Sequence, residues 1–336
     1  MNRNKTIWRI AALAVLLFVV PLEAKNVVVI IAGKGGLQEY QEQFLEQATT
    51  LRELLINEYG YAAHDVILLH EAAEGNRMSR ADNIRLLFQN LRSRLTPTDR
   101  FILVLIGHGS FDGTFGKLNL PGPDLSDADF ADLIESLPTR QVVVINTSSA
   151  SGSFLQKLAG PGRTIITATR SGLERNATHF AEFWLQALAQ KENADLNKDG
   201  RLSVLESFVF ARDQLVRWYE EQRRLRGEHP LLDGNGDGKG TETPDLFTED
   251  GRYAGRIFLE QAQQTGPAEA DQGTLALDRR QKQILEKVQR LQARKDSMPE
   301  DQYYKEFEKL MLELAKLNQR KAGRATPQKQ RLRQEK

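Results

Sequence analysis

The sequence VVVINTSSASGSF, residues 142–154, contains an apolar run that ends abruptly at Asn146 and is followed by small polar residues. Short β-branched runs are typical of buried strands, and small polar residues after them are typical of a tight turn. In open α/β sheets, the turns that follow the carboxyl ends of parallel strands carry the functional groups. The stretch therefore predicts a buried strand that delivers the turn 147–152 to a functional edge.

Strand-like and helix-like segments alternate on both sides of this stretch. Fully apolar strands separated by helices indicate a mainly parallel sheet that is covered on both faces. We therefore predict that residues 25–190 form one three-layer α/β/α domain. The predicted strands are 26–33, 65–70, 100–109, 141–146 and 163–169, and the predicted helices are 37–58, 79–91, 125–137 and 176–190.

The composition excludes several classes of chemistry. The chain has 336 residues, a formal net charge of +1 and no cysteine. Without cysteine there are no disulfides, no thiolate metal sites and no thiol nucleophile. A net charge near zero provides no general attraction to nucleic acid, so no nucleic-acid partner is expected.

The amino-terminal residues have the pattern of a secretory signal. Arg3 and Lys5 precede the apolar run 10–20, and a small residue, Ala24, follows it. This order of basic, apolar and small residues is typical of a signal peptide. The run is shorter than the ~20 apolar residues that a membrane-spanning helix needs. We expect cleavage near Ala24 and a secreted or periplasmic protein; the alternative is an uncleaved membrane anchor.

Two polar groups follow neighbouring predicted strands. His108 lies in LVLIGHGSFDG, residues 103–113, between Gly107 and Gly109, and the small-residue turn follows the next strand. Sequential strands usually lie next to each other. We therefore expect His108 and the turn to share one sheet edge.

Together these motifs resemble the caspase-like fold, and they are most similar to the legumain-type cysteine peptidases and their bacterial relatives. That family has a His-Gly pair after one strand and a catalytic cysteine after the next, commonly as Cys-x-Ser-Gly. The resemblance covers roughly residues 25–215. It implies that His108 and Gly109 match the His-Gly pair and that Ser151 and Gly152 match the Ser-Gly pair, which puts Ser149 at the cysteine position.

The serine at this position leaves three interpretations of the protein's function. A thiol is partly ionised at neutral pH, whereas a serine hydroxyl needs a closely coupled base to act as a nucleophile. We favour a non-catalytic pseudo-peptidase that binds a protein or peptide partner. The alternatives are a hydrolase that uses Ser149 as nucleophile with His108 as base, and an α/β binding module that its carboxyl-terminal helices oligomerise.

A calcium loop of the EF-hand type is predicted at residues 195–206, DLNKDGRLSVLE. Calcium takes about six to eight oxygen ligands, and this twelve-residue spacing provides them, with the Arg201 carbonyl and a water held by Ser203 completing the set. Gly200 stands at the turn position. The expected ligands are Asp195, Asn197, Asp199, Arg201, Ser203 and Glu206.

A second segment, DGNGDGKGTETPDL at 233–246, begins in the same way with Asp233, Asn235 and Asp237. Its twelfth position is Pro244 instead of the expected glutamate, so Glu242 or Asp245 would have to substitute. The alternative is a turn without metal. Calcium beside a secreted α/β domain suggests bracing of the structure rather than signalling.

The carboxyl-terminal part differs from the α/β domain. We expect an EF-hand-containing helical extension at 191–262, a polar linker at 263–274, a helical hairpin or coiled coil at 275–320, and a basic disordered tail at 321–336. The hairpin is predicted because apolar residues recur at alternating steps of three and four. A narrow apolar seam of this kind packs on itself or on a partner helix, so self-association is possible.

Overall fold

The structure is a computed structural model that describes residues 24–261, part of 276–291, and 294–334. The predicted signal peptide before Ala24 and the predicted linker lie outside the described residues. No helix in the described part of the chain is long and apolar enough to cross a membrane.

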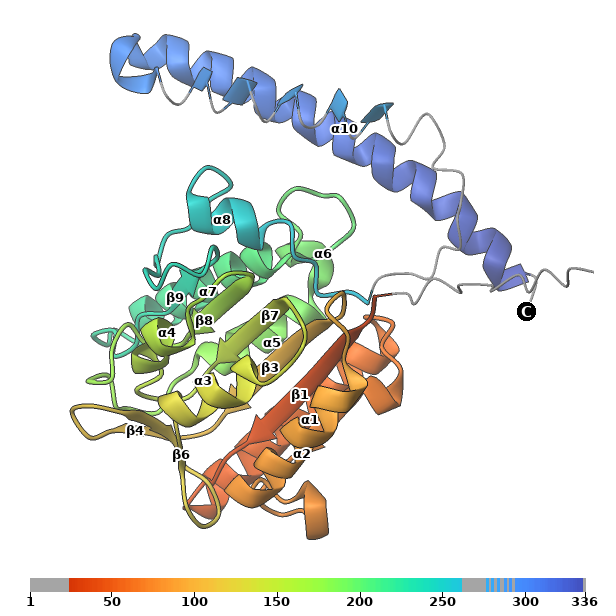
Figure 1. Cartoon of the computed structure of the whole chain (residues 1–336). Coiled ribbons are helices and arrows are strands. Elements are labelled where there is room, and N and C mark those ends of the chain that lie inside the picture. The colour runs from red at the N-terminus through yellow and green to blue at the C-terminus, as the bar shows by residue number, and fades with distance from the viewer. Residues whose placement is uncertain are drawn as a thin grey trace, which may run out of the picture.

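A six-stranded sheet forms the centre of the molecule (Figure 1). Its order is β2-β1-β3-β7-β8-β9; all neighbours are parallel except β9, which runs antiparallel to β8. The mainly parallel sheet predicted from the sequence is confirmed, and it extends past residue 190 because β9 belongs to it. The strands are β1 (Asn26–Ala32), β2 (Val66–Leu69), β3 (Arg100–Ile106), β7 (Gln141–Asn146), β8 (Arg163–Thr167) and β9 (Leu231–Asp233).

Helices cover both faces of the sheet, which confirms the predicted α/β/α sandwich. Alternate residues of each strand point to opposite faces, so the buried strands supply two separate cores. One core joins the sheet to α1 (Gln38–Asn57), α5 (Phe180–Ala189) and α7 (Val204–Glu221). The other joins it to α2 (Ala81–Arg94), α3 (Asp127–Glu135) and α4 (Gly152–Leu158).

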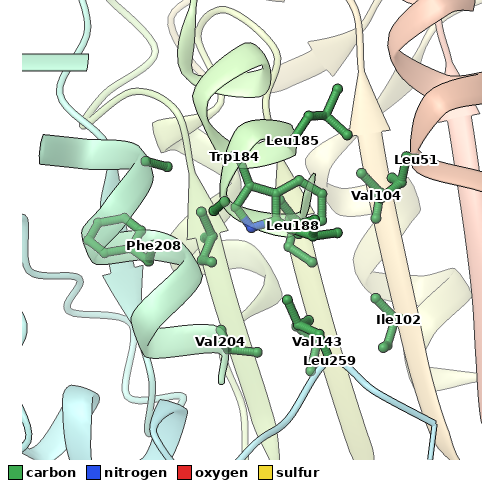
Figure 2. Close-up of a cluster of buried hydrophobic side chains, with 14 of the residues drawn as sticks. Leu51, Ile102, Val104, Val143, Trp184, Leu185, Leu188, Val204, Phe208 and Leu259 are labelled. Carbon is green, nitrogen blue, oxygen red and sulfur yellow. The ribbon is translucent and has the colours of Figure 1, made fainter. Parts of the chain in front are cut away.

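Helices α5 and α7 are packed tightly against the sheet (Figure 2). The indole of Trp184 on α5 lies among buried side chains and donates its N–H to the Ser207 hydroxyl at 3.2 Å. The centroids of the Phe180 and Phe208 rings lie 6.0 Å apart. This packing makes α7, which follows the first predicted calcium loop, part of the same core as the sheet.

A small three-stranded antiparallel sheet follows β3 and was not predicted from the sequence. It consists of β4 (Gly109–Phe111), β5 (Gly116–Leu118) and β6 (Leu125–Ser126), in that order. Ser126 caps α3 by accepting a hydrogen bond from the Asp129 amide, and the Asp129 carboxylate accepts the Ser126 amide in return. The hairpin lies at the carboxyl edge of the main sheet.

The remaining elements lie outside the three layers. They are η1 (Ala63–Asp65), η2 (Gly75–Arg77), α6 (Lys191–Ala194), α8 (Glu249–Ala254), η3 (Lys295–Ser297) and the long α10 (Glu300–Gln334). Ile284 and Val288 pack against Leu314 and Leu317 of α10. Figure 1 shows α10 away from the sheet layers.

The start of β1 is held to the loop before β3. The backbone N–H of Lys25 donates to the Asp99 carboxylate at 3.0 Å, and the Thr96 N–H donates to the other oxygen at 2.8 Å. Asp99 is 1% exposed and forms no ion pair with any described residue.

Candidate functional site

The turn between β7 and α4 is held by its own side chains. Asn146, the last residue of β7, accepts the Ser148 amide at 3.0 Å and the Ser148 hydroxyl at 2.7 Å through Oδ1. Thr147 donates both its amide and its hydroxyl to the Leu105 carbonyl at 2.9 Å. Ala150 has a φ of +55°, which non-glycine residues rarely adopt, and its N–H donates to the Glu174 carbonyl. The turn is therefore fixed from β3 and from the loop after β8.

The Ser149 hydroxyl is hydrogen-bonded to Gly109. It accepts the Gly109 N–H at 3.0 Å and donates to the Gly109 carbonyl at 3.1 Å. Ser149 is 2% exposed. The structure thus brings the His-Gly segment and the small-residue turn together, but it joins them through the backbone of Gly109.

The His108 ring lies against helix α1. Its centroid is 4.5 Å from that of Tyr40 and 5.0 Å from that of Phe44, and both contacts are edge-on. Burial lowers the pKa of His108, which favours the neutral ring at pH 7. No hydrogen bond joins this ring to Ser149 or to any other described residue.

Glycine is required where the two loops meet. A Cβ on Gly109 would lie 2.2 Å from the Ser149 carbonyl oxygen, and one on Gly152 would lie 2.2 Å from the Ser171 backbone nitrogen. These distances are too short for any side chain. The two loops and the segment after β8 can therefore approach only because positions 109 and 152 lack a side chain.

Exposed apolar side chains lie at the same sheet edge. Leu37 follows β1, Phe115 lies in the β4–β5 hairpin after β3, and Leu173 follows β8. The carboxyl ends of parallel strands share one edge, so these three residues lie in loops at the same edge of the sheet as the turn. They are 66%, 39% and 73% exposed, which leaves their apolar surface open to a partner.

A cluster of ionisable residues supports the turn from the loop after β8, and sequence reasoning missed it. Glu174, whose carbonyl accepts the Ala150 amide, pairs its carboxylate with the His229 ring at 2.6 Å. Glu228 accepts the amides of His179 and Phe180. Glu174 belongs to RSGLERN, 170–176, directly after a predicted strand, so its position at the strand end could have identified it.

Burial raises the pKa of Glu228 to about 7. The hydrogen bonds from the two amides and from the Tyr219 hydroxyl, at 3.1 Å, oppose this effect. Burial also raises the pKa of Tyr219 to about 12. Both members of this hydrogen-bonded pair therefore have pKa values above their ordinary range.

The first predicted calcium loop has a closed hydrogen-bonded conformation. The Asp195 carboxylate accepts the amides of Asp199 at 3.1 Å and Gly200 at 2.7 Å. The Glu206 carboxylate accepts the Asn197 amide at 3.2 Å and the Ser203 hydroxyl at 2.7 Å. Gly200 has a φ of +80°, which the turn at this position needs.

The carboxylates of this loop are close enough to affect one another. Burial and then the charge of Asp195 raise the pKa of Asp199, and burial and then the charge of Asp199 raise the pKa of Glu206. Neither Asp195 nor Glu206 forms an ion pair with a described residue. In the described part of the chain, however, no three or more acidic, histidine or cysteine side chains form a group that could hold a metal ion. The Glu206 carboxylate is turned to Ser203 and Asn197 instead.

The second predicted loop repeats the arrangement around Asp233. The buried Asp233 carboxylate accepts the amides of Gly236 at 2.7 Å and Gly238 at 2.8 Å, and the Asn235 side chain accepts the Asp237 amide at 3.0 Å. The two residues considered as substitutes for the twelfth ligand are engaged elsewhere. Glu242 pairs with Arg226, and Asp245 accepts the amides of Phe247 and Thr248.

Asp250, on α8, is an acidic residue beside the second loop. It accepts the Gly234 amide at 2.8 Å. Burial, and then the charges of Asp233 and Asp237, raise its pKa. No sequence spacing pointed to it, because the fold of the segment between Gly238 and α8 determines which carboxylate approaches the loop.

Fold and site define an α/β/α sandwich with a hydrogen-bonded serine turn at its carboxyl edge. No protein-family model and no curated protein matches the chain. Among solved structures, caspase-1 from Spodoptera frugiperda is similar with 9% identity and a TM-score of 0.41, over 63% of this chain and 87% of that chain. A protein from Geobacter sulfurreducens is similar with 14% identity and a TM-score of 0.42, over 68% of this chain and 96% of that chain.

Proposed function

We propose that the protein is a non-catalytic interaction protein on a caspase-like scaffold that binds a protein or peptide at the carboxyl edge of its sheet. The observation that supports this most strongly is the Ser149 hydroxyl, which is hydrogen-bonded to both backbone groups of Gly109. The assignment of the scaffold rests on the resemblance of the two sequence motifs.

The hydrogen bonding at Ser149 is unsuited to nucleophilic catalysis. A serine nucleophile must pass its proton to a base that a third group orients. Here the Ser149 hydroxyl donates to a carbonyl oxygen, and the His108 ring is packed against two aromatic rings of α1. Neither residue is arranged to activate the other.

The surroundings of the turn favour binding. Leu37, Phe115 and Leu173 present apolar side chains at this edge, and the turn at the same edge is fixed by hydrogen bonds to β3 and to the loop after β8. A rigid surface with apolar anchors loses little conformational entropy on binding. A peptide or protein with complementary apolar side chains is the partner that fits this surface.

A peptidase assay tests the non-catalytic assignment. Wild-type protein, Ser149→Ala and His108→Ala would each be incubated with a diverse peptide library, and the products would be measured by mass spectrometry. We expect no cleavage above background by any of the three. Cleavage by wild type that disappears in both variants would establish a serine hydrolase and overturn the proposal. In that case Ser149→Cys would show whether a more nucleophilic sulfur increases the rate.

We also propose that the protein binds calcium at the loop 195–206, which braces α7 against the sheet. The buried carboxylates of Asp195 and Glu206 lack a cationic partner among the described residues, and a cation would relieve the repulsion that each of them has with Asp199. The loop oxygens would hold the ion after Glu206 releases Ser203 and Asn197. Once bound, calcium would supply positive charge and structural stability.

Calcium titration tests this second part. Isothermal titration calorimetry would be carried out on wild type and on Asp195→Ala with Glu206→Ala, with Glu192→Ala and Glu220→Ala as a matched double variant of exposed carboxylates. We expect calcium to bind wild type and the matched variant and to raise their melting temperature. Equal calcium uptake at this loop in the Asp195/Glu206 variant would show that the assignment is wrong.

The signal-like pattern before Ala24 supports export of the protein. Under this proposal the chain acts outside the cytoplasm, secreted or in a periplasm, where calcium is available for a bracing role.

A further inference from the structure

A pocket at the amino edge of the sheet, opposite the serine turn, contains two arginines. The first residues of three neighbouring strands, Asn26, Arg100 and Gln141, lie side by side in register there. Arg201 reaches this pocket from the loop 195–206. The pocket has a volume of about 210 Å³ and is lined by Ala24, Asn26, Thr98, Arg100, Gln141, Arg201, Phe258 and Glu260.

The two guanidinium groups are held without a carboxylate. Arg100 donates to the Gln141 side-chain oxygen at 3.2 Å and to the Phe258 carbonyl at 3.2 Å. The Arg201 guanidinium stacks 3.5 Å from the centroid of the Phe258 ring. Neither arginine forms an ion pair with any residue in the described ranges.

The side chains that line the pocket carry an excess of positive charge. Burial, and then the nearby positive charge of Arg201, act to lower the pKa of Arg100. Glu260 is the one carboxylate among the lining residues. Its Oε1 pairs with Lys191 at 2.5 Å and accepts the Leu202 amide at 2.9 Å, whereas its Oε2 is buried without a hydrogen-bond partner among the described residues. Arg100 is half-buried and Arg201 is exposed, and two positive groups that repel each other are stabilised by an anion between them.

We infer that this pocket binds a compact anion, a carboxylate or a phosphate-like oxyanion, between Arg100 and Arg201. The planar guanidinium presents paired N–H donors that match two oxygens of such a group. Stacking on Phe258 fixes the plane of the Arg201 guanidinium, and hydrogen bonds to Gln141 and Phe258 fix that of Arg100. The pocket is small, so the ligand is a free small molecule or the end of a chain rather than a folded surface.

Isothermal titration calorimetry with phosphate, acetate and citrate, at constant ionic strength and fixed calcium concentration, tests this inference. We expect at least one of the three to bind wild type with one-to-one stoichiometry. Arg201→Gln should weaken that binding by at least about tenfold, since hydrogen bonds to charged groups are lost. Binding by phosphate alone would identify an oxyanion site, and binding by acetate or citrate would identify a carboxylate site.

Two variants keep the test specific. Arg256→Gln removes an exposed arginine that does not line the pocket, and it should bind the anion as wild type does. Arg100→Lys keeps the charge but loses the paired donors, so it should bind more weakly than wild type. The inference is wrong if wild type binds none of the three anions, or if Arg201→Gln binds as tightly as Arg256→Gln does. Circular dichroism spectra of each variant show whether it is folded.

Discussion

Ser149 acts as a structural residue in this fold, because its hydroxyl both accepts from and donates to Gly109. Ser149→Ala removes both hydrogen bonds and leaves the Gly109 amide without its partner. We expect the free energy of unfolding to fall by about 1–2 kcal/mol. Urea unfolding of wild type and variant measures the change.

Ser93→Ala is the control for this substitution. The Ser93 hydroxyl donates to the Asn90 carbonyl on the exposed surface of α2, where water replaces the lost bond. Its effect should lie within about 0.5 kcal/mol. Equal effects of the two substitutions would contradict the structural role assigned to Ser149.

Glu228 should make stability depend on pH. Its carboxyl has a pKa of about 7 in the folded chain, against the ordinary 4.5, so the folded state holds more protons between these values. The free energy of unfolding should therefore fall as pH rises from about 4.5 through 7, by up to about 3 kcal/mol.

Comparison with Glu228→Gln isolates this contribution. The variant cannot ionise, so its urea midpoint should fall less steeply with pH than that of wild type. Glu220→Gln alters an exposed carboxylate of α7 and should keep the wild-type slope. Identical slopes for all three proteins would exclude Glu228 as the source.

At the scale of elements, the long strands could be predicted and the short ones could not. Runs such as 26–32 and 100–106 are apolar throughout, and burial on both faces of the sheet requires that pattern. Strand β3 ends before the predicted 109 because Gly107, with a φ of +150°, turns the chain out of the sheet. Strands β4, β5, β6 and β9 have only two or three residues each, too few for a periodic pattern.

The candidate site could be predicted only in part, because local sequence patterns indicate where strands end but not which distant segments pack there. Strand ends place His108 and Ser149 at one edge, and the backbone contact between Gly109 and Ser149 agrees with that placement. The partners of their side chains depend on packing between distant segments. Tyr40 and Phe44 reach His108 from α1, and no local spacing in the sequence indicates this contact.

Asp250 is expected to contribute to any calcium uptake at the second loop. Asp250 lies beside Asp233 because α8 begins next to Gly234, whose Cβ position is 1.9 Å from the Asp250 carbonyl. If this loop takes up calcium, Asp250→Asn should weaken that uptake by about tenfold or more while the loop 195–206 is unaffected. Calorimetry in the Asp195/Glu206 variant measures the second loop alone. Asp245→Asn is the control, and an equal loss in both would contradict the role of Asp250.

At the scale of the whole molecule, the α/β/α unit and the carboxyl-terminal hairpin have separate cores. Phe247 meets Phe307 of α10 at 6.5 Å between ring centroids and joins the hairpin cluster from the α/β unit. Deletion of 262–336 should therefore leave the free energy of unfolding of the α/β unit within about 1 kcal/mol of its value in the full chain.

Chemical unfolding followed by tryptophan fluorescence measures this effect, since Trp184 and Trp218 both lie in the α/β unit. Phe247→Ala in the full chain removes only the contact with Phe307, so its effect is compared with that of the deletion. A loss of several kcal/mol on deletion would show that the hairpin supports the sheet.

The hydrogen bond between the Lys25 amide and Asp99 would change in chemical character if the chain were cut at the predicted signal-peptide site. Cleavage directly after Ala24 would convert that amide nitrogen into a free ammonium group, 3.0 Å from a carboxylate that has no ion partner among the described residues. The proteolytic cut would itself create an ion pair, and a cut one residue away would not. Protein that begins at Lys25 should therefore melt at a higher temperature than the same chain acetylated at its amino terminus, and Asp99→Asn should abolish the difference. Calorimetric melting of the four proteins decides whether the site of cleavage and the stability of the product are linked.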